Sequence, residues 1–176
     1  MNNGQVKHLY LLRHAQASWQ LAGELDYQRG LTEHGVADCA LVAEHVRSRD
    51  IAPMLVLCSG ARRTKETLEH VAPALPPEAV IEYDDAIYGA DTSAIFGVVS
   101  AAPADVDAIL LIGHNPSMHD FAVELAAGDG PIEELAGSFP KAALAELELD
   151  CEWAELAPDC ARLTEFFRPK EARTAS

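Results

Sequence analysis

The sequence predicts an α/β fold, a three-layer α/β/α sandwich with a mostly parallel central sheet. Short apolar runs without alternation are typical of strands that are buried on both faces. Segments with apolar residues at helical spacing separate these runs, which favours parallel strands joined by helical crossovers. The chain shows no internal repeat, and we expect one domain over residues 1–170 followed by a C-terminal tail at 171–176.

Strands and helices are expected to alternate along most of the chain. The apolar runs that predict strands lie at residues 6–12, 54–59, 79–83, 107–113, 142–149 and 162–169. The segments that predict helices lie at residues 31–49, 61–74, 92–102 and 114–127. Thr32 is the expected N-cap of the first helix, Ser59 could cap the second, and the third begins at Thr92. Residues 128–141 are expected to form a loop or a short helix.

Composition excludes several classes of function. The formal net charge of −15 argues against general binding to nucleic acid or to anionic membrane surfaces. No apolar run approaches the roughly 18 residues of a membrane span. The N-terminus does not resemble a secretory signal, so we expect a cytoplasmic protein. Cys39 and Cys58 fall in apolar segments, and Cys151 and Cys160 could pair, although a cytoplasmic setting disfavours a disulfide.

Polar groups follow three of the expected strands at the point where each strand ends. They are Arg13 and His14 after the first strand, Arg62 and Arg63 after the second, and His114 and Asn115 after the fourth. Each group alone is more typical of a charged surface, a solvated helix face or a turn. Parallel strands bring their carboxyl ends to one edge of a sheet, where ligands bind in open α/β folds. The presence of all three groups at one edge of the expected sheet therefore favours a ligand-binding site.

The residue types in this site fit a phosphoryl group. Guanidinium groups and helix N-terminal amides bind phosphoryl oxygens well. Of two histidines, one neutral ring could attack phosphorus while the other donates hydrogen bonds to the oxygens. Flanking arginines disfavour protonation of the attacking ring, and a hydrogen bond to its second nitrogen would fix its tautomer. We expect no cofactor. We also expect no metal, since the five-residue spacing of His114 and His119 does not place two ligands on one helix face.

The same residues carry a family resemblance. Four segments, "LLRHAQASW", "RGLTEHG", "LVLCSGARRTKETLE" and "LLIGHNPSMHDFAVEL", resemble the histidine phosphatase superfamily, also called phosphoglycerate mutase-like. Within it, the chain is most similar to the small SixA-type phosphohistidine phosphatases, and the resemblance covers almost its whole length. The resemblance implies a phosphoglycerate mutase-like fold and catalysis through a transiently phosphorylated histidine.

The resemblance also implies a role for each matching residue. His14 matches the nucleophilic histidine, Arg13 and Arg63 match two phosphate-binding arginines, and His114 matches the second histidine of the pocket. The residues expected to bind substrate are Arg29, Ser59, Arg62 and Asn115. Arg62 and Arg29 are also expected to belong to a basic rim that recognises protein partners of this otherwise acidic chain.

One departure from the family pattern bears on the substrate. In the mutases and many phosphomonoesterases, an acidic residue after the equivalent of Ile87-Tyr88 protonates the leaving alcohol, and here that place is Gly89. A leaving imidazole does not need such an acid, so its absence favours a phosphoramidate such as phosphohistidine. Asp85 and Asp91 are the carboxylates that could still reach the site as a general acid.

These observations lead to one expected function and two alternatives. We expect a phosphatase that removes phosphate from phosphohistidine on a partner protein, for example a histidine phosphotransfer domain. One alternative is a small-molecule phosphomonoesterase that acts on a phosphorylated metabolite. The other is a non-catalytic module that binds phosphate or a phosphoprotein, against which stands the complete set of four site residues.

Overall fold

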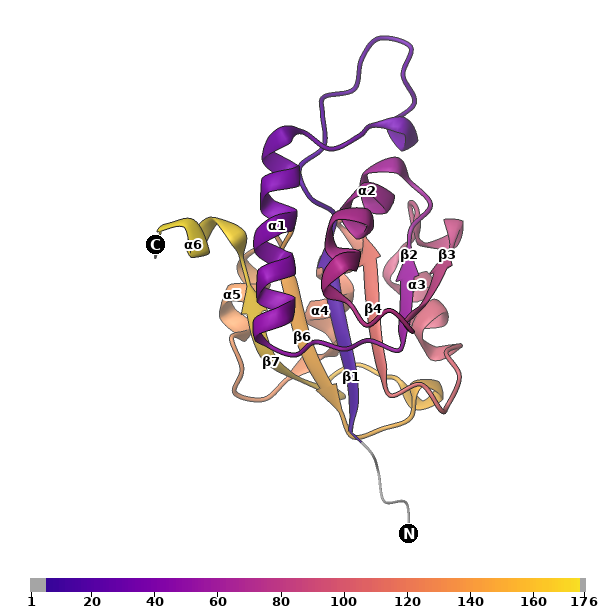
Figure 1. Cartoon of the computed structure of the whole chain (residues 1–176). Coiled ribbons are helices and arrows are strands. Elements are labelled where there is room, and N and C mark those ends of the chain that lie inside the picture. Colours follow the sequence, from indigo (N-terminus) through magenta and orange to yellow (C-terminus); the bar gives the residue numbers. More distant parts are fainter. Residues whose placement is uncertain (1–5, 175–176) are drawn as a thin grey trace.

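The computed structural model describes residues 6–174 and has the expected three-layer architecture (Figure 1). One seven-stranded sheet has the strand order β3-β2-β4-β1-β6-β7-β5. The strands are β1 Lys7–Arg13, β2 Leu55–Cys58, β3 Val80–Tyr83, β4 Ala108–Gly113, β5 Ala126–Ala127, β6 Leu144–Leu149 and β7 Ala161–Phe167. The α-helices are α1 Glu33–Ser48, α2 Arg62–Val71, α3 Thr92–Ser100, α4 Ser117–Leu125, α5 Ile132–Gly137 and α6 Pro169–Thr174.

The sheet is mostly parallel, as predicted. Strands β3, β2, β4 and β1 pair in parallel, whereas β6 pairs antiparallel with both β1 and β7. Strand β5 pairs in parallel with β7, so among the strands of residues 6–174 only β6 runs against the others. The carboxyl ends of β1, β2 and β4 therefore lie on the same edge of the sheet.

The central strand β1 explains why its sequence is a continuous apolar run. Leu9 and Leu11 belong to the core that lies between the sheet and helices α3 and α4. Tyr10 and Leu12 belong to a second core, which lies on the face covered by α1 and α2 (Figure 1). A strand with a core on each side needs apolar side chains at every position, so the alternation of a half-exposed strand is absent.

The beginnings of three helices show which side chains satisfy the first backbone amides. The Thr32 hydroxyl accepts a hydrogen bond from the Gly35 amide (3.0 Å), so Thr32 caps α1 as expected. The expectation for Ser59 is wrong, because α2 begins after Ala61 and has no side-chain cap. Helix α3 begins at Thr92 as expected, and the carboxylate of Asp91 caps it by accepting from the Ala94 amide.

The C-terminal end differs from the expectation. Residues 171–174, expected to begin a tail, belong to helix α6, whose first residue, Pro169, is buried. Helix α6 lies against α1, and this tertiary contact gives order to a segment with no apolar periodicity. Residues 175–176 lie outside the described residues.

Two further features complete the fold. The four cysteines all have free thiols, so Cys151 and Cys160 do not pair. Within residues 6–174, there is no helix with both the length and the apolar character that a membrane span requires.

Candidate active site

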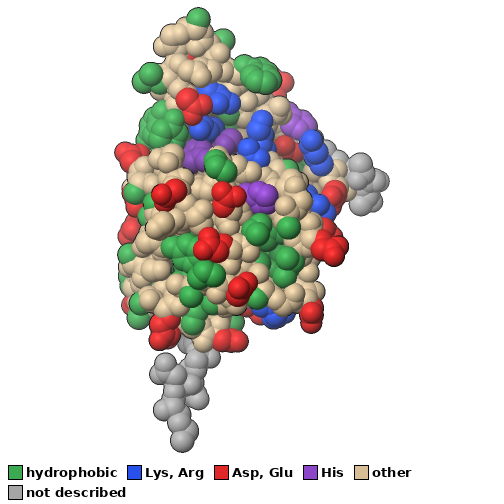
Figure 2. Space-filling model, turned by 180° about the vertical axis from the view of Figure 1, so that it is seen from behind, with side chains coloured by type: hydrophobic (Ala, Val, Ile, Leu, Met, Phe, Trp, Pro, Cys, Tyr) green, Lys and Arg blue, Asp and Glu red, His purple; other side chains and the backbone are tan. Residues whose placement is uncertain are grey.

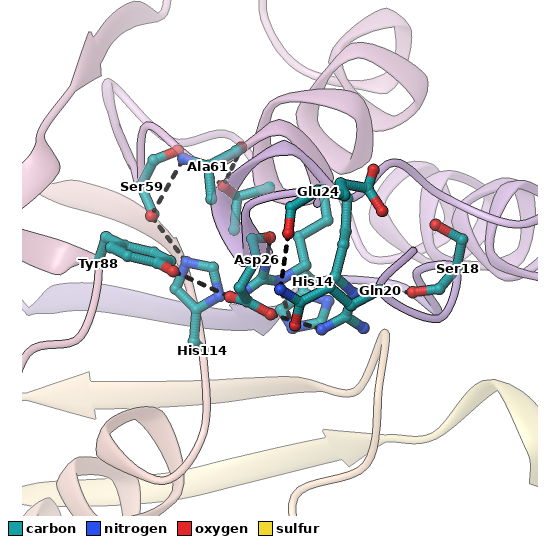
Figure 3. A network of polar contacts seen from close by, with 12 residues as sticks. His14, Ser18, Gln20, Glu24, Asp26, Ser59, Ala61, Tyr88 and His114 are labelled. Carbon is teal, nitrogen blue, oxygen red and sulfur yellow. Dashed lines mark hydrogen bonds and ion pairs between the residues drawn. The ribbon is translucent and has the colours of Figure 1, made fainter. Parts of the chain in front are cut away.

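Three strand ends bring two histidines and an arginine together at the carboxyl edge of the sheet. His14 follows β1, Arg63 lies in the first turn of α2, and His114 follows β4, and all three side chains are buried. The two imidazole rings lie 5.1 Å apart between centroids. The His14 amide donates to the Gly113 carbonyl (3.1 Å), which extends the β1–β4 pairing as far as the histidine. Rigid strand ends thus position the cluster (Figure 3).

The hydrogen bonds of His14 define its tautomer. Its Nδ1 lies 2.7 Å from the carbonyl oxygen of Ala15, and because a carbonyl only accepts, Nδ1 carries the proton. The other ring nitrogen, Nε2, therefore presents its lone pair and accepts a hydrogen bond from Nε of Arg63 (3.3 Å). Burial first, and then the neighbouring His114, Arg63 and Arg13, lower the pKa of His14 to about 3, against an opposing effect of the hydrogen bond to Ala15. At neutral pH, His14 is therefore an uncharged imidazole with the lone pair of Nε2 facing Arg63.

His114 is oriented by Ser59, the residue that follows β2. Nε2 of His114 lies 2.7 Å from the Ser59 hydroxyl, which also accepts from the Ala61 amide (3.5 Å). The Ser59 hydroxyl can donate its proton to His114 Nε2, and in that tautomer the ring proton is on Nδ1. Within the described part of the chain, His114 Nδ1 is buried and has no hydrogen-bond partner. Burial first, and then the charge of Arg63, lower the pKa of His114 to about 4.

Arg13 and Asn115 lie side by side against the carbonyl oxygen of Phe139. Arg13 donates to this oxygen through Nη1 (2.8 Å), and Asn115 donates through Nδ2 (2.9 Å). Arg13 Nε and Asn115 Oδ1 are buried without a partner among residues 6–174. A buried polar group without a hydrogen bond is costly, so an arginine N–H of this kind is suited to a ligand oxygen.

A carboxylate that the sequence analysis did not single out, Asp26, holds Arg63 in place. Asp26 lies in a short 3-10 helix, in the loop that projects beyond the sheet between β1 and α1 (Figures 1 and 3). Arg63 donates to its Oδ2 (2.9 Å) and to its backbone oxygen (2.7 Å). Tyr88 donates to Oδ2 (2.9 Å), and Arg29 donates to Oδ1 (2.6 Å). The only sequence signal was the spacing of three residues between Asp26 and Arg29.

The network keeps Asp26 ionised. Partial burial alone would raise the pKa of Asp26, but hydrogen bonds from Arg29, Tyr88 and Arg63 outweigh this effect and lower the pKa to about 2. A carboxyl group with this pKa carries no proton at neutral pH, so Asp26 is suited to orient Arg63 and unsuited to protonate a leaving group.

Two arginines expected to contact substrate are engaged elsewhere. Arg62 is exposed, and its Nε donates to Glu66 (2.6 Å), so the structure does not bring it into the cluster. Arg29 approaches the cluster only through Asp26, and its Nε donates to the Ser18 carbonyl (2.8 Å). Both guanidinium groups therefore have carboxylate partners, and the basic rim expected to include Arg29 and Arg62 stays a prediction.

The expected general acids are also engaged in other contacts. Asp91 caps α3, and Asp85 accepts a hydrogen bond from Tyr27 (2.6 Å). A side chain at Gly60 would collide with this pair, because its Cβ would lie 2.0 Å from Asp85 Oδ1. Gly89 has φ of +68°, a conformation that favours glycine, so the place expected for an acid holds no carboxylate. Within residues 6–174, no group of three His, Cys, Asp or Glu side chains is arranged to hold a metal ion.

Replacing Asp26 with asparagine is expected to lower kcat/KM for an aryl phosphate by roughly 10- to 100-fold, because a displaced arginine no longer faces the reacting atoms. Steady-state kinetics on Asp26→Asn measures this effect. Asp85→Asn is the matched control, and its kcat/KM should stay within about threefold of wild type, since Asp85 contacts Tyr27 and not Arg63. A large loss of kcat/KM in Asp85→Asn with none in Asp26→Asn would mean that Asp85, and not Asp26, supports the reaction.

Comparison with known proteins agrees with this geometry. The sequence profile of the "Histidine phosphatase superfamily (branch 1)" matches residues 9–90. A structure from Nakamurella multipartitia, provisionally named phosphohistidine phosphatase SixA, superposes with a TM-score of 0.82 at 30% identity, over 93% of this chain and 96% of that one. A protein of the same provisional name from Agrobacterium tumefaciens gives 0.78 at 31% identity, over 93% and 99%.

An uncharacterized protein of Mycobacterium tuberculosis is 29% identical over 163 residues, which are 90% of this chain and all of that protein. The profile and the two structures together define the class: this chain belongs to the histidine phosphatase superfamily and is of the SixA type. The fold is phosphoglycerate mutase-like, as the sequence resemblance implied.

Proposed function

We propose that this protein is a phosphatase that hydrolyses phosphohistidine on a partner protein through a phosphohistidine formed on His14. The single observation that carries the proposal is the state of His14. It is a buried, neutral imidazole with its proton fixed on Nδ1 and the lone pair of Nε2 directed at Arg63. The family and the SixA-type structures support phosphatase activity, and the names of those structures support a phosphohistidine substrate.

In the first step, Nε2 of His14 attacks the phosphorus atom. The bond between phosphorus and the substrate nitrogen breaks, its electron pair stays on the substrate imidazole, and that ring takes a proton from solvent. Arg13 and Arg63 bind the phosphoryl oxygens as the charge is redistributed, and His114 donates a hydrogen bond from Nδ1. In the second step, water attacks the phosphorus, the bond to Nε2 breaks, and inorganic phosphate leaves with neutral His14 restored.

The leaving group separates this proposal from a metabolite phosphatase. An alkoxide is a poor leaving group, and a positioned acid contributes roughly 10²- to 10⁴-fold to its departure. The cluster offers none, since Asp26 is ionised and hydrogen-bonded to Arg29, Arg63 and Tyr88. An imidazole leaves as a neutral base after protonation, so this site suits a phosphorus–nitrogen bond better than an alkyl phosphate ester.

The test is a comparison of three substrates: a phosphohistidine peptide, an aryl phosphate and an alkyl phosphate. We expect efficient hydrolysis of the peptide, slower hydrolysis of the aryl phosphate, and alkyl phosphate turnover lower by roughly 10²-fold or more than that of the aryl phosphate, because no acid assists the alkoxide. Equal turnover of the alkyl and aryl phosphates would favour the metabolite phosphatase. Binding of phosphate without hydrolysis of any substrate would favour the non-catalytic module.

A further inference from the structure

A pocket at the carboxyl end of β1 is basic although the chain as a whole is acidic. It has a volume of about 370 Å³, and Arg13 is part of its wall. The cationic side chains that line it are Arg13, Lys141, Arg168 and Lys170. We call this feature the basic pocket. The proposed function assigns Arg13 to the phosphoryl group, so a group bound in the basic pocket would lie beside that phosphoryl group.

The four cations of the basic pocket come from three separate parts of the chain. Arg13 ends β1, Lys141 lies in the turn before β6, and Arg168 and Lys170 flank the start of α6. The Ala142 amide donates to the Arg13 carbonyl (3.1 Å), which fixes the turn with Lys141 beside β1. Lys170 belongs to helix α6, which the sequence did not predict, so this helix places the fourth cation of the basic pocket.

The charges in the basic pocket are only partly neutralised. Arg168 pairs with Glu134 and Glu171, whereas neither Lys141 nor Lys170 forms an ion pair within residues 6–174. The wall also carries one carboxylate, Asp38, which is buried and faces His34 across 3.5 Å. Partial burial first, and then the nearby positive charges of Arg13, Arg29 and Lys170, lower the pKa of Lys141. Cations that repel one another in this way favour an anionic occupant.

The surface around the active site also combines local positive charge with an acidic remainder. In Figure 2, most Lys and Arg side chains of the visible face gather in an upper band that also carries histidines, and Asp and Glu side chains predominate below. A chain with a net charge of −15 repels an acidic partner over most of its surface. Because only the upper band of Lys and Arg side chains attracts an acidic partner, this band fixes the orientation in which the partner can approach.

We propose that the basic pocket binds acidic side chains of the protein substrate, in the segment that flanks its phosphohistidine. The inference rests on the proposed function and adds a rule for substrate choice. Lysine ammonium groups bind carboxylates, and the volume falls within the range of about 300–1,000 Å³ that is typical of ligand pockets. Several cations from three segments suit a chain segment with more than one carboxylate better than a single small anion.

The test uses two phosphohistidine peptides that differ only in the flanking residues, Asp and Glu in one and Asn and Gln in the other. For the wild type, kcat/KM should be about tenfold higher for the acidic peptide, because charge complementarity accelerates association. In the double variant Lys141→Glu and Lys170→Glu, this preference should vanish or reverse. The readout is the ratio of kcat/KM for the two peptides, and hydrolysis of an aryl phosphate by the variant shows that it is folded.

The matched control is the double variant Arg47→Glu and Lys65→Glu. Both residues are exposed and lie outside the basic pocket, and the change in net charge is the same. This control should keep the preference for the acidic peptide. Equal losses with both peptides in the Lys141/Lys170 variant, or the same loss of preference in the control, would overturn the inference alone. Hydrolysis of the aryl phosphate without hydrolysis of either peptide would overturn the proposed function and the inference together.

Discussion

Replacing His14 with alanine is expected to reduce kcat/KM by about 10⁴-fold or more, whichever phosphoryl substrate is used. The reason is that, in the proposed mechanism, Nε2 of His14 forms the covalent bond to phosphorus. His114 turns its own Nε2 toward Ser59 (2.7 Å) and is not free to attack. The measurement is steady-state hydrolysis of the phosphohistidine peptide and the aryl phosphate by wild type and by His14→Ala.

A second readout on the same variant tests the intermediate itself. Rapid quenching at alkaline pH followed by mass spectrometry should find a phosphoryl group on residue 14 of the wild type and none in His14→Ala. His8→Ala is the matched control, since His8 lies on the same strand, outside the cluster, and stacks on Tyr10. It should keep both the rate and the phosphoenzyme. Persistent turnover in His14→Ala would show that another group, or water, attacks phosphorus directly.

Arg63→Ala is expected to lower kcat/KM by about 10²- to 10³-fold, the usual loss when one donor to a charged transition state is removed. Arg63 has a double effect, because its Nε faces His14 and its other nitrogens are held by Asp26. The variant should therefore bind inorganic phosphate less tightly and also form the phosphoenzyme more slowly. Inhibition by phosphate and single-turnover kinetics measure these two effects separately.

The neighbouring arginine provides the control for this experiment. Arg62 precedes Arg63 in the chain, yet it is exposed and pairs with Glu66. Arg62→Ala should leave kcat/KM within about twofold of wild type, as is usual for exposed side chains away from a site. Equal losses in both variants would mean that the pair acts through net charge alone and would contradict the specific geometry assigned to Arg63.

The parts of the site that the sequence could predict are those fixed by strand ends. Buried runs end at His14 and His114, and the carboxyl ends of parallel strands share one edge, so pattern and topology together place these residues. Helical spacing alone could not distinguish Arg62 from Arg63, which adjoin in the chain; the family pattern made that choice, and the structure brings only Arg63 to His14.

The parts that the sequence could not predict depend on tertiary contacts. Asp26 reaches Arg63 because the loop after β1 folds back over the edge of the sheet, and no local pattern defines such a path. Strand β5 has two residues and exists only through its pairing with β7, so it was assigned to the preceding helix. Helix α6 likewise depends on its contact with α1 and has no apolar stripe to predict it.

The two cores that share β1 have an evolutionary consequence. His14 is attached to a strand whose side chains pack on both faces of the sheet, so almost any shift of this residue would disturb the whole interior. Lys141 and Lys170 are carried instead by a turn and a short helix, where insertions and substitutions are readily tolerated. Changes at Lys141 and Lys170 can therefore alter the basic pocket while the position of His14 stays fixed.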